Sequence, residues 1–566
     1  MHISEGFLPI SHCIGWAAAA AVPTIISVRA ISRDLDRKRE NRVLLAASAA
    51  FLFTLSSLRM PSLTGSSSHP TGTAVGTYLF GPRAMPALAL ITLIFQALLL
   101  AHGGLTTLGA NLFSLGIAGP WAMWLLLRLM LKIGWSRDRS IFISTVAGDL
   151  ATYVTTAAQL GLAYPSAHGG FLGSFLKFLG VFLITQIPIA IAEGMLTVAL
   201  LRALAASEVE GIGTAVIHGS SVWKSGASVV GVLALLVAGM YVVNEHKAQT
   251  GTDDRAENTI QALRPGYHPI AVPVYTPGKT AEGLLFTAQG AAGVLILGWV
   301  IYRLRRHGKN ARHRIHVHAH LNDIAFTNRW RHRNPWEKVL FGGGFLLVAM
   351  LVPPLPWCLA IAAIVTLAAT AGARIPLRSW LTVLAIPVSF AVMTAIGIAV
   401  EAGGPASHLL LRVDWNAVPL AAGLLVRSVA AVCCLAFIGW TTPLMELIPV
   451  FGKAGIPPVL VDLALTIYRF LFVMATTLSE MRRAQSWRMG NATYQTRLRA
   501  LSMLAGGLFV RCVDRVRRLE EGMEARGYEG RLWVLGAERG LSPVVAGGIV
   551  ALQASVFILG KGLIGR

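Results

Sequence analysis

Charged residues are scarce in this chain. Of its 566 residues only 13% are Asp, Glu, Lys or Arg, and 54% are hydrophobic, whereas an ordinary soluble domain carries about 25% charged residues. Acidic residues are the scarcest charged group, with 27 Asp and Glu against 49 Lys and Arg. This composition excludes an ordinary soluble globular protein and indicates a chain that lies mainly in a membrane.

Cysteine and nucleotide-binding motifs are also poorly represented. The five cysteines show no CxxC spacing, so we expect small core residues rather than a metal cluster or a disulfide framework. The sequence "PGKT" at 277–280 has Pro273 where a phosphate-binding GxxxxGK[ST] loop needs its first glycine. No ATPase is therefore expected in this chain.

Apolar stretches long enough to cross a bilayer recur along the sequence. A helix needs about 20 apolar residues to span a hydrocarbon core of about 30 Å, and we expect about a dozen spans. The candidates are 9–31, 43–58, 84–101, 110–132, 141–163, 174–204, 225–243, 283–302, 338–356, 358–373, 380–400, 417–439, 455–478 and 541–560.

The net charge of +22 follows the positive-inside distribution. Lys and Arg lie in short loops between apolar runs, which argues against nucleic acid as a partner. The basic run between Arg29 and Arg42 places the first loop in the cytoplasm, so the N-terminus is expected outside the inner, cytoplasmic membrane. No basic region precedes the first apolar run, and we expect no cleaved signal.

Two polar interruptions, at 205–224 and 303–338, divide the sequence into three modules. We predict an all-α polytopic membrane protein of two helical bundles, 1–220 and 306–566. They are joined by a two-helix module, 221–305, whose proline-rich loop lies outside. That loop is either a linker or a cover for a neighbouring module.

The opening sequence "MHISEGFLP" can bind a metal ion. The amine of Met1, the main-chain nitrogen of His2 and its imidazole are consecutive along a short piece of chain and close small chelate rings. Nitrogen ligands of this kind suit Ni, Cu, Zn and Co. A second histidine, His69, lies in the polar loop "SSSHPTGTAVG" and offers a fourth nitrogen. An ordinary exposed histidine at position 2 is the competing interpretation.

These residues also carry a resemblance to a known family. "MHISEGFLP", "SSSHPTGTAVG" and "PIAIAEGMLT" resemble the substrate-binding component, CbiM or NikM, of cobalt and nickel energy-coupling-factor (ECF) transporters. "GTDDRAENTIQ", "PGYHP" and "LLFTAQG" are similar to the small CbiN component. "NDIAFTN", "NPWEKVL", "TTPLMELIPVF" and "MEARGY" resemble CbiQ, the transmembrane coupling component.

The resemblance implies that Met1, His2 and His69 hold the metal. Other polar residues in or near the apolar segments either support these ligands or form hydrogen bonds between helices, because polar groups in spans are costly. They are His102, Asn111, Asp149, Gln159 and Glu193.

The resemblance further implies contacts with ATPases through two cytoplasmic motifs. One is intact as Ala525, Arg526 and Gly527. The other falls near Arg488 and Gly490, where Ser486 and Trp487 depart from the usual pattern and leave its register open. Arginines that contact lipid phosphates are the alternative; this applies to Arg482, Arg483, Arg515, Arg517 and Arg518.

We therefore expect the membrane subunit of a Co²⁺ importer, not an enzyme, with no cofactor and with separate cytoplasmic ABC-type ATPases and membrane lipids as partners. Ni²⁺ is the alternative cargo, and an ATP-independent metal channel or scaffold is the alternative class. The tract "HRIHVHAH" at 313–320 is interpreted as a solvated linker rather than a metal relay.

Overall fold

The computed structural model describes most of the first and third predicted modules. The described residues are 2–37, 41–58, 60–61, 67–165, 170–206, 324–352, 354–402, 411–413, 418–453, 455–487, 504, 507–515, 518, 521–522, 525, 527 and 540–562. Met1, the predicted middle module and the His-rich tract lie outside them. The described helices belong to one compact unit, and the strands at 400–402 and 411–413 belong to a second.

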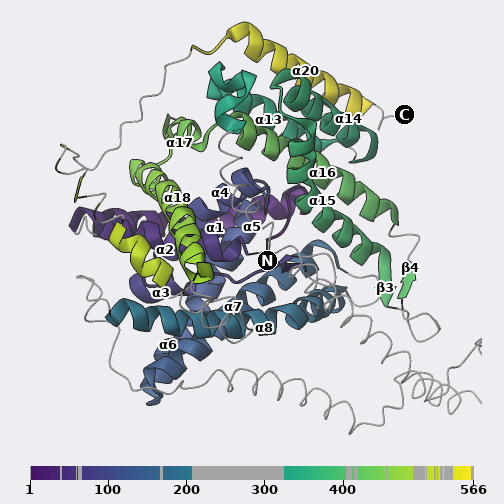
Figure 1. Ribbon diagram of the computed structural model, residues 1–566. Helices are drawn as coiled ribbons and strands as arrows, with labels where there is room; N and C mark the ends of the chain where they lie inside the picture. Colours follow the sequence, from purple (N-terminus) through teal and green to yellow (C-terminus); the bar gives the residue numbers. More distant parts are fainter. Residues whose placement is uncertain are drawn as a thin grey trace, which may run out of the picture. The chain divides into compact units, whose positions relative to one another are not determined.

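The described part of the first module is mainly helical (Figure 1). It also contains one short antiparallel strand pair. The π-helical turn η1 continues directly from α5 into α6 and interrupts the regular hydrogen-bond pattern within one apolar span. The elements are α1 (Ile10–Arg37), α2 (Asn41–Ser56), β1 (Met60–Pro61), β2 (Ser67–Ser68), α3 (Ala74–Phe80), α4 (Met85–Leu100), α5 (Leu108–Leu112), η1 (Phe113–Ala118), α6 (Gly119–Lys132), α7 (Arg137–Ala163) and α8 (Gly170–Ala206).

Small residues bring α6, α7 and α8 close together. A Cβ atom on Gly148 of α7 would lie 2.7 Å from Cβ of Met123, and one on Gly194 of α8 would lie 2.9 Å from the ring of Phe142. Close backbone approach at glycine is the usual basis of helix packing in membranes, where lipid is as apolar as the side chains. Helices α6, α7 and α8 are therefore closely packed and can hold buried polar side chains in fixed positions.

The third module is built from longer helices and one further hairpin. The helix α13 ends at Leu351, earlier than the predicted 356, because the two prolines at 353–354 disfavour continuation of a helix. The elements are η3 (Arg329–His332), α13 (Pro335–Leu351), α14 (Pro354–Leu367), η4 (Ala368–Gly372), α15 (Leu377–Ala399), β3 (Val400–Ala402), β4 (Leu411–Val413), α16 (Val418–Thr441), α17 (Leu444–Lys453), α18 (Pro458–Trp487) and α20 (Pro543–Gly562).

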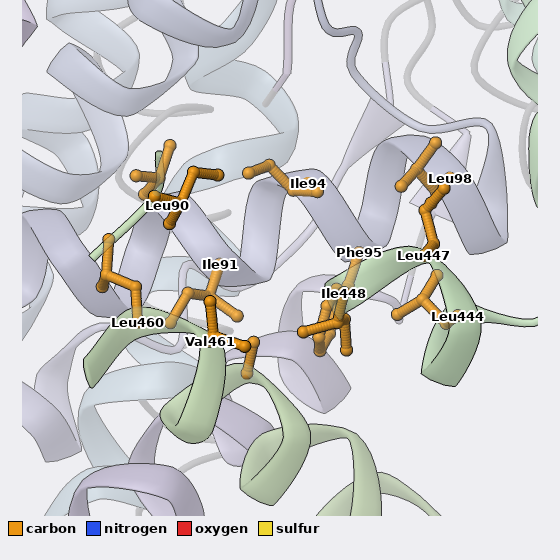
Figure 2. A pocket seen from close by; sticks show the side chains of 12 residues that line it. Leu90, Ile91, Ile94, Phe95, Leu98, Leu444, Leu447, Ile448, Leu460 and Val461 are labelled. Carbon is orange, nitrogen blue, oxygen red and sulfur yellow. The ribbon is translucent and has the colours of Figure 1, made fainter. Parts of the chain in front are cut away.

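Helix α4 packs on α17 and α18 through apolar side chains (Figure 2). Leu90, Ile91, Ile94, Phe95 and Leu98 of α4 face residues of the other two helices. The contact leaves a cavity of about 50 Å³ with no polar lining. The pocket offers no polar group that could orient a ligand, so it is a packing gap between the helices rather than a ligand site.

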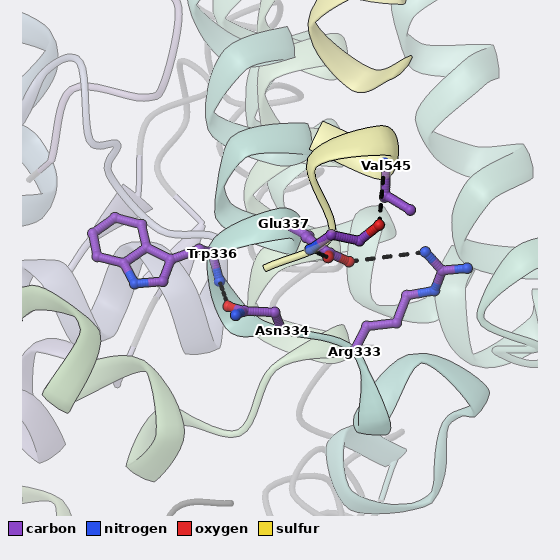
Figure 3. Close-up of polar contacts among 6 residues, drawn as sticks. Arg333, Asn334, Trp336, Glu337 and Val545 are labelled. Carbon is purple, nitrogen blue, oxygen red and sulfur yellow. Dashed lines mark hydrogen bonds and ion pairs between the residues drawn. The ribbon is translucent and has the colours of Figure 1, made fainter. Parts of the chain in front are cut away.

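The start of α13 is tied to the last helix by polar contacts (Figure 3). Asn334 caps α13, and its Oδ1 accepts from the main-chain nitrogen of Trp336 at 2.8 Å. Glu337 Oε1 accepts from the main-chain nitrogen of Ser542 at 3.0 Å, just before α20, and Glu337 Oε2 lies 3.8 Å from Arg333. Further along, Gln553 of α20 donates to the carbonyl of Leu340 at 2.9 Å.

The prediction of an all-α polytopic membrane protein is confirmed. Among the described residues, seven helices are long and apolar enough to span a membrane, or eight if the bent pair Gly170–Gly180 and Thr185–Arg202 forms one span. The predicted spans at 43–58 and 84–101 are shorter apolar helices of 16 residues each. The predicted spans at 225–243 and 283–302 lie outside the described part of the chain.

Candidate metal centre

The segment that precedes α1 is folded into the first module and held through its main chain. The Ile3 nitrogen donates to Asn111 Oδ1 at 2.7 Å, and the Asn111 amide donates back to the Ile3 carbonyl at 3.0 Å. The Thr107 hydroxyl donates to the same carbonyl at 2.8 Å. This pairing satisfies both main-chain groups of Ile3 and fixes the position of His2 beside it.

Glu5 holds the same segment to the turn that follows α4. Its main-chain nitrogen donates to the Gly103 carbonyl at 3.1 Å, and its carboxylate accepts from the main-chain nitrogens of Leu105 and Thr106 and from the Thr106 hydroxyl. Burial raises the pKa of Glu5, while the hydrogen bonds from Thr106 and Leu105 lower it. A Cβ atom on Gly104 would lie 2.7 Å from the Glu5 Cα, so this close approach requires glycine.

The turn after α4 directs His102 back toward the N-terminal segment. Ala101 has φ 46° and Gly103 has φ 75°, and the His102 nitrogen donates to the Gln96 carbonyl at 3.1 Å. A left-handed residue at this point is a common way to end a helix. A Cβ atom on Gly103 would lie 3.4 Å from the His2 Cβ, so the turn packs directly on His2.

Three histidines meet at this position. One ring nitrogen from each of His2, His69 and His102 can be chosen so that all three lie within 4.8 Å of one another. The ring centroids are 4.8 Å apart for His2 and His69, 4.7 Å for His2 and His102, and 5.4 Å for His69 and His102. All three side chains are buried.

A chain of hydrogen bonds sets the tautomer of His2. The Ser56 hydroxyl donates to the Leu52 carbonyl at 2.5 Å, so its oxygen accepts from the Gln96 amide, also at 2.5 Å. Gln96 Oε1 then faces His2 Nε2 at 2.7 Å and must accept its proton. In the neutral ring the lone pair therefore resides on Nδ1, the nitrogen nearer to the His2 main chain.

His69 is fixed in the complementary tautomer. Its Nδ1 lies 2.9 Å from the Pro70 carbonyl, which can only accept, so the lone pair of the neutral ring resides on Nε2. The Tyr153 hydroxyl donates to the His69 carbonyl at 3.0 Å. Outer contacts of this kind orient histidines that bind metals.

Glu193 of α8 anchors the loop that carries His69. Its carboxylate accepts from the main-chain nitrogens of Thr71 and Gly72 at 2.6 and 2.8 Å and from the Thr71 hydroxyl at 2.9 Å. Gly72 has φ 70°, and a Cβ atom there would lie 2.9 Å from the Leu52 Cα, so the loop needs glycine at this point. Both oxygens of the buried carboxylate thus accept hydrogen bonds from this loop.

Two more buried polar residues support the same frame. Asp149 Oδ2 accepts from the Gln186 amide at 2.6 Å, and that amide also lies 3.4 Å from the His69 carbonyl. Gln159 donates to the Ala110 carbonyl at 3.0 Å, beside Asn111. Each side chain contacts a segment that carries a histidine or its support, rather than the histidine cluster itself.

The structure thus brings together His2, His69 and His102, and it places Asn111, Asp149, Gln159 and Glu193 around them. Met1 lies outside the described residues. Sequence reasoning missed Glu5, Gln96, Tyr153 and Gln186. Gln96 and Gln186 could have been found as polar residues within apolar runs. Glu5 lies within the opening motif "MHISEGFLP". Tyr153 gave no signal, because one tyrosine within a predicted helix is not unusual.

The predicted ATPase-coupling residues are only partly described. Ala525 and Gly527 are exposed, and Gly527 has φ 82°. Arg526, Arg488 and Gly490 lie outside the described residues.

Comparison with known families covers most of the chain. Residues 2–210 match the cobalt uptake substrate-specific transmembrane region CbiM, residues 223–314 match the cobalt transport protein component CbiN, and residues 327–533 match the cobalt transport protein CbiQ. A putative fused cobalt transport protein CbiMQ from Methanocorpusculum labreanum is 33% identical over 98% of both chains. The chain belongs to the fused cobalt transport proteins of the ECF type.

Other relatives match one part of the chain. Cobalt transport protein CbiM 1 from Pelobacter propionicus is 50% identical over 39% of this chain and 97% of its own. A solved chain described as a truncated transition metal transporter is 25% identical over 36% of this chain and 98% of its own, with a TM-score of 0.33 that supports no structural argument. Membership of this transport family, rather than of an enzyme family, agrees with the expectation from the sequence.

Proposed function

We propose that the chain is the membrane permease subunit of an ECF-type ABC importer that captures Co²⁺ at the histidine cluster. The supporting observation is that one nitrogen from each of three buried imidazoles lies within 4.8 Å of the others. Within the described residues this group contains no carboxylate. Nitrogen donors without carboxylates suit late transition metals rather than Mg²⁺ or Ca²⁺.

The tautomers support a chelate at the N-terminus. With the proton on Nε2, His2 offers Nδ1, which can close a six-membered ring with the main-chain nitrogen of the same residue. The Met1 amine would close a further five-membered ring with that nitrogen. His69 Nε2 would supply a fourth nitrogen, because its Nδ1 is committed to the Pro70 carbonyl.

His102 adds a further donor to this proposal. The sequence left His102 open between a support of the ligands and a residue that packs helices together, but its ring lies as close to His2 as that of His69 does. It could serve as an additional ligand or replace a ligand during entry or release. The cobalt families matched by all three parts of the chain favour Co²⁺, and Ni²⁺ is the alternative cargo because it favours the same nitrogen ligands.

Transport would be driven by separate cytoplasmic ATPases that bind the Ala525–Gly527 motif. In this arrangement the chain lies in the inner membrane with its N-terminus outside, so that metal is captured outside and ATP is used inside. The exposure of Ala525 and Gly527 is compatible with a docking surface. Arg526 would supply a planar fork of donors to acidic or carbonyl groups of the partner.

Uptake by whole cells tests the proposed function. Cells that carry this chain together with its candidate ATPases should accumulate labelled Co²⁺, and cells that carry the chain alone should not. Nickel competition in the same assay ranks the two ions. Equal uptake with and without ATPases would contradict the importer and favour an ATP-independent channel.

The coupling motif can be tested separately. Arg526→Glu places a negative charge where the partner is expected to present acceptors, and such a contact can cost several kcal/mol. Co-purification of the ATPases and uptake should both fall, while Co²⁺ binding should remain. Arg482→Glu on α18, an exposed arginine, is the matched control and should have a milder effect, about 1 kcal/mol if the side chain meets lipid phosphates. Full retention of ATPases by Arg526→Glu would remove the coupling role.

A further inference from the structure

Helix α16 contacts the end of α4 at a glycine. A Cβ atom on Gly439 would lie 2.0 Å from the Leu98 carbonyl oxygen, so the two backbones touch with no side chain between them. Leu98 lies two residues beyond Gln96, whose side chain holds His2. The contact with α16 therefore lies two residues from the side chain that contacts His2.

Helix α16 also contacts the N-terminal segment, about three turns before Gly439. Gly6 has φ 74°, and a Cβ atom there would lie 3.3 Å from Arg427 Cγ and 3.4 Å from its carbonyl oxygen. Gly6 is therefore packed on the backbone of α16 at Arg427. The next residue, Phe7, accepts a hydrogen bond through its carbonyl from the Tyr164 hydroxyl.

Arg427 is an unusual residue for this position. It lies within a helix long and apolar enough to span a membrane, where a charged side chain is costly and often functional. Its Nη2 atom donates to the Val352 carbonyl in a long hydrogen bond of 3.5 Å. Its Nε atom is buried and has no hydrogen-bond partner among the described residues.

We infer that α16 is the element through which the third module senses whether the metal site is loaded, with Arg427 and Gly439 as its two contact points. This inference rests on the proposed function. The two contacts fall on the two segments that position His2, namely the N-terminal segment and α4. Metal binding would join His2, His69 and His102 to one ion and shift the N-terminal segment, so the surface that α16 touches would differ between the empty and the loaded states. Such a difference in contacts is what coupling between two sites requires.

The Gly439 contact is tested in the full chain with its ATPases. Gly439→Leu inserts a side chain between α16 and α4 and leaves every proposed ligand unchanged. We expect any loss of Co²⁺ affinity to stay below about tenfold, the lower range for loss of an outer contact such as that of Gln96. Co²⁺-dependent stimulation of ATP hydrolysis and Co²⁺ uptake should each fall by about tenfold or more. Gly439→Ala inserts a smaller side chain, so its Co²⁺ uptake and its stimulation of ATP hydrolysis should lie between those of wild type and Gly439→Leu.

The matched control is Gly343→Leu on α13, where a Cβ atom would meet nothing within 4 Å. This variant adds the same side chain to another helix of the third module and should keep uptake and stimulation unchanged. Arg427→Met removes the charge and keeps an unbranched side chain, and it should uncouple ATP hydrolysis from Co²⁺ in the same way. Arg378→Met on α15, at an exposed arginine, is its control.

Each outcome decides the question. Uncoupling with retained Co²⁺ binding supports α16 as the sensing element. Wild-type coupling in both Gly439→Leu and Arg427→Met overturns it, and so does a parallel loss of Co²⁺ binding, because the contacts would then only build the site. If wild type itself neither binds nor imports Co²⁺, the proposed function fails first and the inference falls with it.

Discussion

The two faces of α4 make different kinds of contact. One face presents Gln96, which joins Ser56 and His2 through hydrogen bonds of 2.5 and 2.7 Å. The opposite face presents Ile91, Ile94 and Leu98, which pack on α17 and α18 around an apolar pocket (Figure 2). The same helix therefore holds His2 of the proposed metal site on one side and contacts the third module on the other.

The polar face of α4 must keep one geometry, whereas its apolar face can shift against the neighbouring helices. Hydrogen bonds are directional, and leaving a buried partner unsatisfied costs about 1–3 kcal/mol. Apolar contacts are not directional and depend mainly on buried area. A helix built in this way can hold His2 in one orientation while its apolar face shifts against a neighbouring module. Variants on the two faces should accordingly differ in what they impair.

The largest effect is expected at the proposed ligands. His2→Ala, His69→Ala, or one extra residue before Met1 should lower Co²⁺ affinity by more than about 100-fold, which is the upper range for loss of an outer contact alone. Each change removes a nitrogen or displaces the amine. Equilibrium Co²⁺ titration of the purified full chain, tagged at its C-terminus, measures the effect.

His12→Ala on α1 is the matched control for these variants, because His12 lies on the same chain segment but outside the histidine cluster. It should bind Co²⁺ as wild type does. An N-terminally extended protein with native affinity would show that the Met1 amine is not a ligand. His102→Ala in the same series separates a ligand from a neighbour: a loss as large as that of His69→Ala makes it a ligand.

A smaller effect is expected at the polar face of α4. Gln96→Leu removes the acceptor of His2 Nε2–H, so the ring loses its fixed tautomer while every proposed ligand is kept. Loss of such an outer contact lowers metal affinity by about 10–100-fold. Thr92→Val is the control, because Thr92 is buried on the same face and its hydroxyl donates to Ala49 instead of His2. Equal affinities for Gln96→Leu and Thr92→Val would show that Gln96 has no part in the site.

The sequence predicted the helices well because their causes are local. Long apolar runs placed α7 and α16 within a few residues, and the prolines after Leu351 explain why α13 ends early. The start of α1 was also close to prediction, although the helix continues to Arg37 through a basic stretch beyond the apolar run. The predicted module boundaries and the external loop stay predictions.

The candidate metal centre was predictable only in part, because most of its supports come from distant parts of the sequence. His2 and His69 stood in motifs that could be read directly. Gln96 and Ser56 are 94 and 54 residues from His2, and no local sequence pattern indicates that hydrogen bonds connect them to it. Glu193 was singled out as a polar residue in a span, but only the fold shows that it holds the Thr71–Gly72 backbone.

The smallest effect is expected at the apolar face of α4. Ile91→Val removes one methyl group from a side chain that is 4% exposed, beside a cavity that already exists. Such a change should destabilise the chain by about 1 kcal/mol and leave Co²⁺ affinity unchanged, because no hydrogen bond of the site is touched. Thermal unfolding of the purified chain, with and without Co²⁺, measures both quantities. Ile25→Val, half-exposed on α1, is the control and should change neither. If Ile91→Val weakens Co²⁺ binding as much as Gln96→Leu does, the two faces of α4 are not separable and the apolar contact is itself part of the metal site.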